Sequence, residues 1–301
     1  MKRRIVSVLA AIALGLSTVG VAAPALAQAR GGTYYVALGD SVAAGTGNVP
    51  YVAVVCPHTD GTMKPALRSK RSAYPTLLAA KLRVPVVSEA CAEYDTQEVA
   101  LYQLGDLGPA TRLVTMTVGV NDVQWPALDG IPFDPAPDWA DALGACSNAS
   151  TLAACEFAVQ LSLSTLDDLP QKIAGLIGTI RAKAPKAKIF VTGYAPLFGD
   201  VSATCGVGGG LSFEPAQVKL LNDAVLEVDR RIAAGVTATR DAKAGYVDVV
   251  QRFDGHGLCD SGVPWIGGIQ PPESPAVDGA FHPNGLGQSA YAHVLKQAIT
   301  G

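Results

Sequence analysis

The sequence predicts a three-layer α/β/α domain built around a five-stranded parallel sheet. Two observations carry this prediction: apolar, β-branched runs recur along the chain, and stretches of helical periodicity separate them. Strands that alternate with helices need crossover connections, and these make neighbouring strands parallel. The expected strands are Tyr34–Leu38, Val84–Ser88, Leu113–Val118, Lys188–Thr192 and Gly245–Val250.

The helices expected between these strands follow from apolar residues at spacings of three and four. The 215–241 stretch shows this best, because Val218, Leu221, Val225, Val228 and Ile232 lie on one helical face. The expected helices are Tyr74–Leu82, Thr96–Gln103, Leu161–Ala184, Pro215–Asp241 and Gly287–Ile299.

The first 27 residues have the features of a secretory signal peptide. A basic start, Met1–Arg4, precedes a short apolar stretch and then the small-residue site that ends at Ala27. The competing interpretation is a retained membrane anchor, but the stretch is short for a span and the cleavage site follows it closely. We expect cleavage after Ala27, a catalytic domain over 28–301 and a secreted protein without a stable membrane span.

The charge balance argues against some partner classes. The formal net charge is −3, and three of the basic residues belong to the leader, so the exported part is more acidic still. Nucleic acids and anionic membrane surfaces are therefore not expected as electrostatic partners.

The six cysteines all follow the leader and predict three disulfides in an oxidising compartment. Spacing alone allows fifteen pairings. We favour the sequential set, Cys56–Cys91, Cys146–Cys155 and Cys205–Cys259. A zinc site is disfavoured because no two cysteines lie two to four residues apart.

Long excursions interrupt the strand–helix pattern at 124–150, 199–213 and 254–280. They are rich in proline or glycine, and the first also carries Trp125, Phe133 and Trp139. Such loops at the carboxyl edge of a sheet commonly wall or cover a site. Disulfide-tied surface loops are the other interpretation.

The strongest chemical signal is Gly39-Asp40-Ser41-Val42, directly after the first expected strand. It places the Ser41 hydroxyl at the sheet edge where ligands bind in open α/β folds. Alone, such a serine is most often a helix cap. The nucleophile motif G-x-S-x-G is absent, because Ala43 occupies the position of its second glycine.

Of the four histidines, His282 is the best candidate for a general base. Pro283 favours an extended backbone before it, in a loop just ahead of the last helix. His293 lies within that helix, His58 in a loop beside Cys56, and His256 in a Gly-rich loop where a structural role is favoured over substrate contact.

Oxyanion donors are expected at two further strand ends. Asn121, in Gly119-Val120-Asn121-Asp122, carries an amide that can donate to a developing alkoxide. The other candidate stretch is Glu89–Thr96, after the second strand.

Together these motifs resemble the SGNH hydrolase superfamily, the GDSL-type lipases and esterases, particularly the exported three-disulfide enzymes of actinobacteria. The resemblance spans nearly the whole exported chain and rests on Gly39-Asp40-Ser41, Gly119-Val120-Asn121-Asp122 and His282-Pro283-Asn284. It implies a flavodoxin-like SGNH hydrolase fold, a catalytic Ser41 and His282, and an oxyanion hole of the Ser41 N–H, the Asn121 amide and a further backbone N–H.

The chain departs from the family pattern at two positions. Glu93 stands where the family has the glycine that supplies the backbone N–H of the oxyanion hole. Gly279 stands where the family has the aspartate three residues before the histidine, and Asp278 lies one residue further back. By resemblance to relatives that orient histidine through a backbone carbonyl, we expect a Ser41–His282 dyad held by the Gly279 carbonyl, with Asp278 as the alternative.

The expected function is hydrolysis of carboxylic esters of fatty acyl chains, phospholipids included, by a two-step acyl transfer without metal or organic cofactor. The partner is then a small-molecule or lipid ester, and we expect a monomer. The alternatives are a carbohydrate esterase that deacetylates polysaccharide and a secreted binding protein that has lost activity, which Glu93 and Gly279 would favour.

Overall fold

A parallel sheet of five strands forms the centre of the computed structural model, which describes residues 34–123, 139–147, 151–274 and 277–301. The strand order is β4-β1-β5-β6-β9, and every neighbouring pair is parallel. The strands are β1 (Tyr35–Gly39), β4 (Val86–Ser88), β5 (Leu113–Thr117), β6 (Lys188–Thr192) and β9 (Ala244–Val247). The α/β/α prediction is confirmed.

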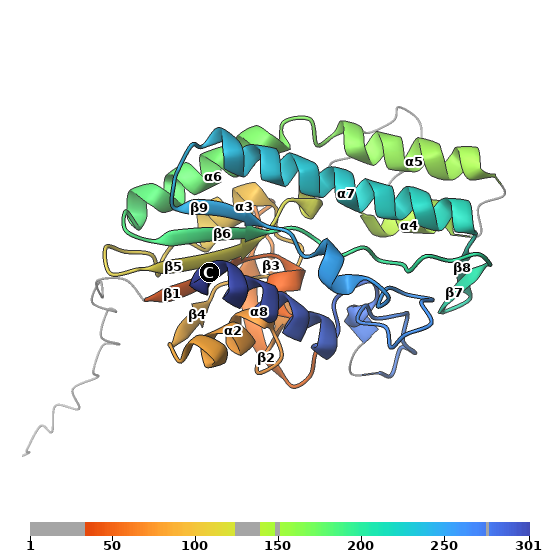
Figure 1. Ribbon diagram of the computed structural model, residues 1–301, viewed down its shortest axis with the longest axis horizontal. Helices are drawn as coiled ribbons and strands as arrows, with labels where there is room; N and C mark the ends of the chain where they lie inside the picture. Colours follow the sequence, from red (N-terminus) through yellow and green to blue (C-terminus); the bar gives the residue numbers. More distant parts are fainter. Residues whose placement is uncertain (1–33, 124–138, 148–150, 275–276) are drawn as a thin grey trace, which may run out of the picture. The chain divides into compact units, whose positions relative to one another are not determined.

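Helices cover both faces of the sheet (Figure 1). Helices α2 (Tyr74–Leu82) and α8 (Gly285–Thr300) pack together on one face. On the other face, α6 (Leu169–Lys183) packs against α3 (Thr96–Tyr102) and α7 (Pro215–Ala238). Strands β1 and β5 are fully buried between these layers, which is why they have apolar residues on both faces.

The long helices differ in part from the prediction. The apolar face of α7 is buried as expected, with Leu221 and Ile232 at 2% and 0% exposure. The single helix expected over 161–184 is wrong: α5 (Leu152–Ser164) ends and α6 begins at Leu169. Pro170 lies in the first turn of α6, a position that tolerates its missing N–H, whereas a helix interior does not.

Several short elements were not predicted from the sequence. They are α1 (Ser41–Ala44), α4 (Trp139–Cys146), the hairpin β7 (Cys205–Gly208) and β8 (Leu211–Phe213), and the 3-10 turns η1 (Val120–Asp122), η2 (Val250–Phe253) and η3 (Val277–Gly279). The last expected strand ends earlier than predicted, because β9 ends at Val247 and η2 begins at Val250.

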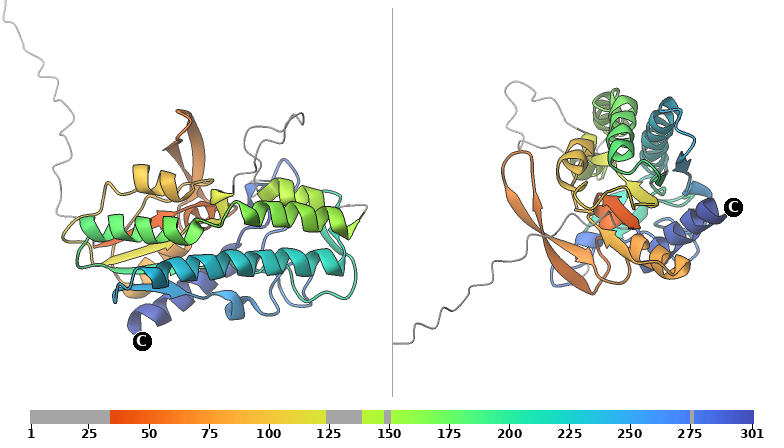
Figure 2. Two further views of the ribbon diagram at one scale, coloured as in Figure 1. Left: turned by 90° about the horizontal axis from the view of Figure 1, so that it is seen from above. Right: turned by 90° about the vertical axis from the view of Figure 1, so that its left-hand side faces the viewer.

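A second hairpin, β2 (Tyr51–Pro57) and β3 (Met63–Ser69), pairs outside the central sheet. Figure 2 shows this orange hairpin extending away from the sheet. It remains attached through the disulfide between Cys56 and Cys91, which lies in the loop after β4. Arg68 on β3 adds hydrogen bonds to the carbonyl of Ser88, at the end of β4, and to that of Ala90 in the same loop.

All three predicted disulfides are present: Cys56–Cys91, Cys146–Cys155 and Cys205–Cys259. The second joins α4 to α5, and the third joins β7 to the loop after η2. The proposed leader and the proline-rich part of the first excursion, with Trp125 and Phe133, lie outside the described residues. Within the described part of the chain, no helix is both long and apolar enough to span a membrane.

Candidate active site

Ser41 begins α1, at the point where β1 reaches the carboxyl edge of the sheet. The preceding Gly39 has a φ of 123° and lies so close to β5 that a Cβ would be 2.1 Å from the Thr117 carbonyl oxygen. Only glycine fits this approach. Asp40 caps α1 by accepting from the Val42 N–H at 2.9 Å. The cap expected of Ser41 alone is therefore made by Asp40, and the Ser41 hydroxyl is left to face His282.

The histidine loop brings His282 to Ser41 across the whole length of the chain. The Nε2 atom of His282 lies 2.8 Å from the Ser41 hydroxyl oxygen. The Asn48 amide helps to hold the two loops together, because it donates to the carbonyls of Thr46 and Pro283. The pairing of Ser41 with His282 was predicted from the sequence, and the role of Asn48 was not.

A backbone carbonyl orients the imidazole, but it is not the one expected. The Nδ1 atom of His282 lies 2.8 Å from the Ala280 carbonyl oxygen. The Gly279 carbonyl instead accepts the backbone N–H of His282 at 3.1 Å. The prediction that the Gly279 carbonyl binds Nδ1 is therefore wrong by one residue. In this tight turn the Gly279 carbonyl points to the His282 backbone N–H and the next carbonyl, of Ala280, points to the ring. The Asp278 side chain is exposed and lines the cavity near the imidazole without replacing Ala280 as the partner of Nδ1.

Burial sets the protonation state of the imidazole. It lowers the pKa of His282 below its usual value, although the Ala280 carbonyl and the charge of Asp278 act in the opposite direction. The ring is therefore neutral at neutral pH and can accept a proton from the Ser41 hydroxyl.

Asn121 lies at the end of β5, in η1, and lines the same cavity as Ser41 and His282. Its amide donates one N–H to the Tyr94 carbonyl at 3.1 Å, which leaves the second N–H for another acceptor. The neighbouring Asp122 is tied to the start of α3 through the Thr96 N–H and hydroxyl. These bonds fix the turn that carries Asn121.

Glu93 also lines the cavity, with a φ of 67°. This is the left-handed conformation that a glycine would adopt without strain. The Glu93 side chain turns outward, 65% exposed, and pairs with Lys64 of the β2–β3 hairpin at 2.7 Å. Glutamate at the position where the family has glycine thus keeps the glycine-like backbone conformation and adds an exposed carboxylate beside the cavity.

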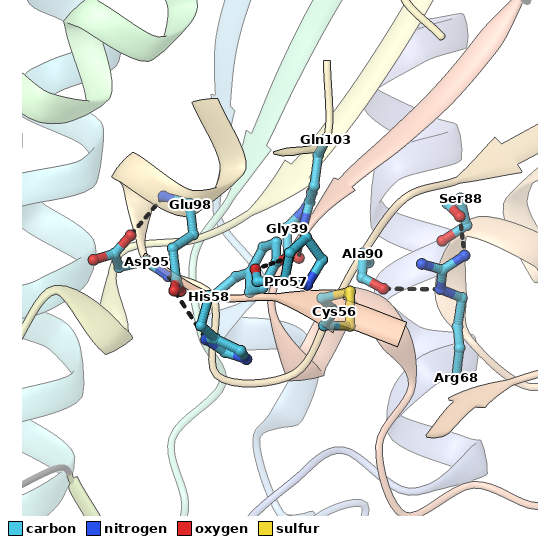
Figure 3. The surroundings of a disulfide bond; sticks show 12 residues. Gly39, Cys56, Pro57, His58, Arg68, Ser88, Ala90, Asp95, Glu98 and Gln103 are labelled. Carbon is cyan, nitrogen blue, oxygen red and sulfur yellow. Dashed lines mark hydrogen bonds and ion pairs between the residues drawn. A yellow bond between two sulfur atoms is a disulfide. The ribbon is translucent and has the colours of Figure 1, made fainter. Parts of the chain in front are cut away.

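Buried polar residues beneath Ser41 were not predicted. Gln103 accepts from the Gly39 N–H at 2.6 Å and donates to the Gly39 carbonyl at 2.8 Å (Figure 3). Tyr194 donates to the second oxygen of Asp40 and accepts from the Val120 N–H. Burial raises the pKa of Asp40 to about 7, although the hydrogen bonds that its carboxylate accepts, from Tyr194 and Val42 among others, lower it.

The cavity that these residues line has a volume of about 1010 Å³. Its apolar lining, which we call the apolar wall, comes from α4, the loop after β6, β8, α7 and the loop before α8; it comprises Leu143, Leu197, Leu211, Leu221, Val225, Val228, Ile266, Ile269 and Phe281. The hairpin and the loop after β4 contribute polar residues to the cavity, namely Tyr51, His58, Lys64 and Glu93. His58 was not predicted to line the site. Its place beside Cys56, which is tied by a disulfide to the loop that carries Glu93, could have indicated this.

The other histidine considered for substrate contact does not line this cavity. The His256 ring stacks on Trp265 with 3.6 Å between ring centroids, and its Nδ1 atom is 2.9 Å from the Val263 carbonyl oxygen. His256 therefore has the structural role that was favoured for it.

The chain is similar to several bacterial lipases along most of its length. It is 31% identical to a lipase of Streptomyces rimosus over 293 residues, covering 96% of this chain and 93% of the relative. It is also 31% identical to lipase 1 of Streptomyces coelicolor over 294 residues, covering 95% and 94%.

Solved structures agree with this relationship. The extracellular lipase of Streptomyces rimosus superposes with a TM-score of 0.69 at 27% identity, covering 88% of this chain and 99% of that one. Phospholipase A1 of Streptomyces albidoflavus NA297 gives the same TM-score and coverage at 28% identity. The model of the GDSL-like lipase/acylhydrolase family matches residues 37–290. The chain therefore belongs to the GDSL-like lipase/acylhydrolase family.

Proposed function

We propose that this protein is an exported serine hydrolase that cleaves fatty acyl esters with Ser41 as nucleophile and His282 as general base. The observation that carries the proposal is the 2.8 Å contact between His282 Nε2 and the Ser41 hydroxyl, in two residues that line the same largely apolar cavity. A nucleophile, a base within hydrogen-bond reach and a group that orients the base are the parts that acyl transfer needs.

The reaction proceeds in two steps. His282 accepts the Ser41 proton while the serine oxygen attacks the ester carbonyl, and the imidazolium then protonates the departing alcohol to leave an acyl-enzyme. Water, deprotonated by the same imidazole, attacks this intermediate, and the fatty acid leaves as Ser41 regains its proton. No metal or organic cofactor takes part in this scheme.

The oxyanion of each tetrahedral intermediate needs donors on the side of the cavity away from His282. We assign these to the Ser41 N–H, the free N–H of the Asn121 amide and the Glu93 N–H. The Ser41 N–H lies in the first turn of α1, where backbone donors have no helical partner. Preorganised donors of this kind are worth about 3–4 kcal/mol each in the transition state.

The apolar wall supports a fatty acyl chain as the acid part of the substrate. Leu221 and Val228 project from α7 and Ile266 from the loop before α8, and all three line the cavity. Burying each methylene of an acyl chain there contributes about 0.8 kcal/mol. Relatives that are lipases and a phospholipase A1 agree with this substrate class.

The decisive experiment measures hydrolysis of p-nitrophenyl esters from acetate to palmitate by the wild type, Ser41→Ala and the control Ser289→Ala. Ser289 is an exposed residue of α8. We expect rates that rise with chain length, a loss of at least about 10³-fold for Ser41→Ala and wild-type rates for the control. Equal rates for the wild type and Ser41→Ala on every ester would refute the proposal that the protein is a serine hydrolase. Activity on the acetate ester alone would favour a carbohydrate esterase.

Export is part of the proposal. The basic and apolar leader, the three disulfides and an extracellular relative support it. We expect protein collected from the culture medium to begin at Gln28 or within a few residues of it. An intact leader on the extracellular protein, or retention of the whole protein with the cells, would contradict cleavage after Ala27.

A further inference from the structure

A second histidine, His58, lines the cavity, and Glu98 and Tyr94 hold its ring in place. It follows β2 directly and is 8% exposed. Its Nδ1 atom lies 2.9 Å from a carboxylate oxygen of Glu98, and the Tyr94 ring lies edge-on at 5.3 Å between centroids. Figure 3 shows the imidazole turned so that Nδ1 meets Glu98 and the opposite nitrogen points away from it.

The other ring nitrogen of His58 has no role in holding the hairpin. Among the described residues, Nε2 makes no hydrogen bond, while the side chain lines the same cavity as Ser41. A structural histidine would need only the Glu98 contact. A buried polar side chain whose remaining nitrogen meets a cavity is instead suited to bind a ligand.

Lys64 of β3 adds a positive charge to the same cavity. Its ammonium donates to Glu93 at 2.7 Å, and the two side chains are 51% and 65% exposed. Ion pairs as exposed as this one contribute about 0–1 kcal/mol, so the ammonium can turn to a ligand at little cost. The ammonium has three N–H donors, of which Glu93 takes one.

We propose that His58 and Lys64 form a subsite for the phosphate group of a glycerophospholipid whose acyl ester is cleaved at Ser41. This inference rests on the proposed function, because the ester must be the reacting group. The apolar wall would take the acyl chain, and the subsite would take the charged end of the same molecule.

The chemistry of the two side chains favours an anionic oxygen ligand. Because Glu98 accepts from Nδ1, an imidazole that donates from both ring nitrogens can bridge Glu98 and a phosphate oxygen. Lys64 would bind the phosphate as a point charge. A neutral triacylglycerol offers these two groups only uncharged ester oxygens, so the subsite distinguishes phospholipids from neutral esters.

The test compares two monomeric butyrate esters, dibutyroyl phosphatidylcholine and p-nitrophenyl butyrate, in His58→Gln and Lys64→Gln. The controls are His293→Gln and Lys296→Gln, exposed residues of α8. We expect the ratio of kcat/KM for the phospholipid to that for the p-nitrophenyl ester to fall at least tenfold in both cavity variants, through KM, and to stay within twofold in both controls. Equal losses on the two substrates would show a structural role and overturn the proposal.

Binding without hydrolysis provides the second measurement. We expect sn-glycero-3-phosphocholine to inhibit p-nitrophenyl butyrate hydrolysis competitively in the wild type and at least tenfold more weakly in both cavity variants. Inorganic phosphate should inhibit in the same pattern and choline should not, which separates the phosphate from the rest of the headgroup. Inhibition by choline alone, or equal inhibition of wild type and variants, would overturn the proposal.

These measurements distinguish failure of the proposed function from failure of the proposed phosphate subsite. If the wild type hydrolyses no ester, the proposed function fails, and calorimetric titration of wild type and Lys64→Gln with sn-glycero-3-phosphocholine still decides the subsite. Lys64 is half-exposed, so its variant is expected to fold even if His58→Gln does not.

Discussion

Replacing Asp278 by asparagine tests how the imidazole of His282 is held. The ring nitrogen Nδ1 lies 2.8 Å from the Ala280 carbonyl oxygen, while Asp278 is exposed and acts on the ring only through its charge. The substitution removes that charge and leaves the carbonyl in place. Orientation of the imidazole is therefore expected to survive.

The size of the effect follows from this geometry. In a serine triad, replacing the aspartate that holds the histidine by asparagine costs about 10⁴ in kcat. An exposed charge that makes no hydrogen bond to the ring contributes about 0.2–1 kcal/mol, a factor of about 1.4 to 5. We expect Asp278→Asn to lose no more than about fivefold in kcat.

The assay is the steady-state hydrolysis of p-nitrophenyl butyrate from pH 5 to 9, with Asp254→Asn as an exposed control at the end of η2. Because the Asp278 charge raises the pKa of His282, the rising limb of kcat/KM should also move to lower pH in Asp278→Asn. A loss of a hundredfold or more at pH 8, without such a loss in the control, would refute the carbonyl-held dyad and make Asp278 a third member.

Three further results are expected. In the wild type, kcat/KM should rise with pH through an apparent pKa below 6.5, because burial lowers the pKa of His282 and only the neutral ring accepts a proton; a midpoint above 6.5 would contradict this. Gly39→Ala should lower the free energy of unfolding in urea by at least about 3 kcal/mol, because the new Cβ would clash with the Thr117 carbonyl at a positive φ. The control Gly105→Ala should stay near the wild type, because a Cβ at Gly105 meets nothing within 4 Å. Glu93→Gly should be about 0.5–1 kcal/mol more stable than Glu93→Ala in the same assay, because only glycine adopts a φ of 67° without strain; the reverse order would show that the backbone relaxes.

The central sheet was predictable because its strands are buried on both faces. Continuous apolar runs such as Leu113–Thr117 need no partner information to be recognised as strands. The β2–β3 hairpin was not predictable in this way. Only Cys56 of β2 is fully buried, and the attachment of the hairpin depends on a disulfide to Cys91 and on hydrogen bonds from Arg68.

The contacts around the expected site residues were less predictable than the residues themselves. Gln103 and Tyr194 lie far from Ser41 in the chain and give no local signal, yet they bind Gly39 and Asp40 in the folded protein. Ala280 replaces Gly279 beside the imidazole because the direction of a carbonyl depends on backbone angles, which residue identity alone leaves open in a turn.

The sequence by itself determined the buried central strands and the placing of Ser41, Asn121 and His282 after strand ends or before the last helix, and it left fifteen disulfide pairings, of which we favoured the sequential one. These are properties of local pattern, because periodicity and turn chemistry act over a few residues. Only the tertiary structure decided which carbonyl holds His282, where Glu93 directs its carboxylate and that His58 shares the cavity with Ser41. Those outcomes depend on contacts between segments far apart in the chain, and their geometry exists only once the sheet, the hairpin and the histidine loop have packed together.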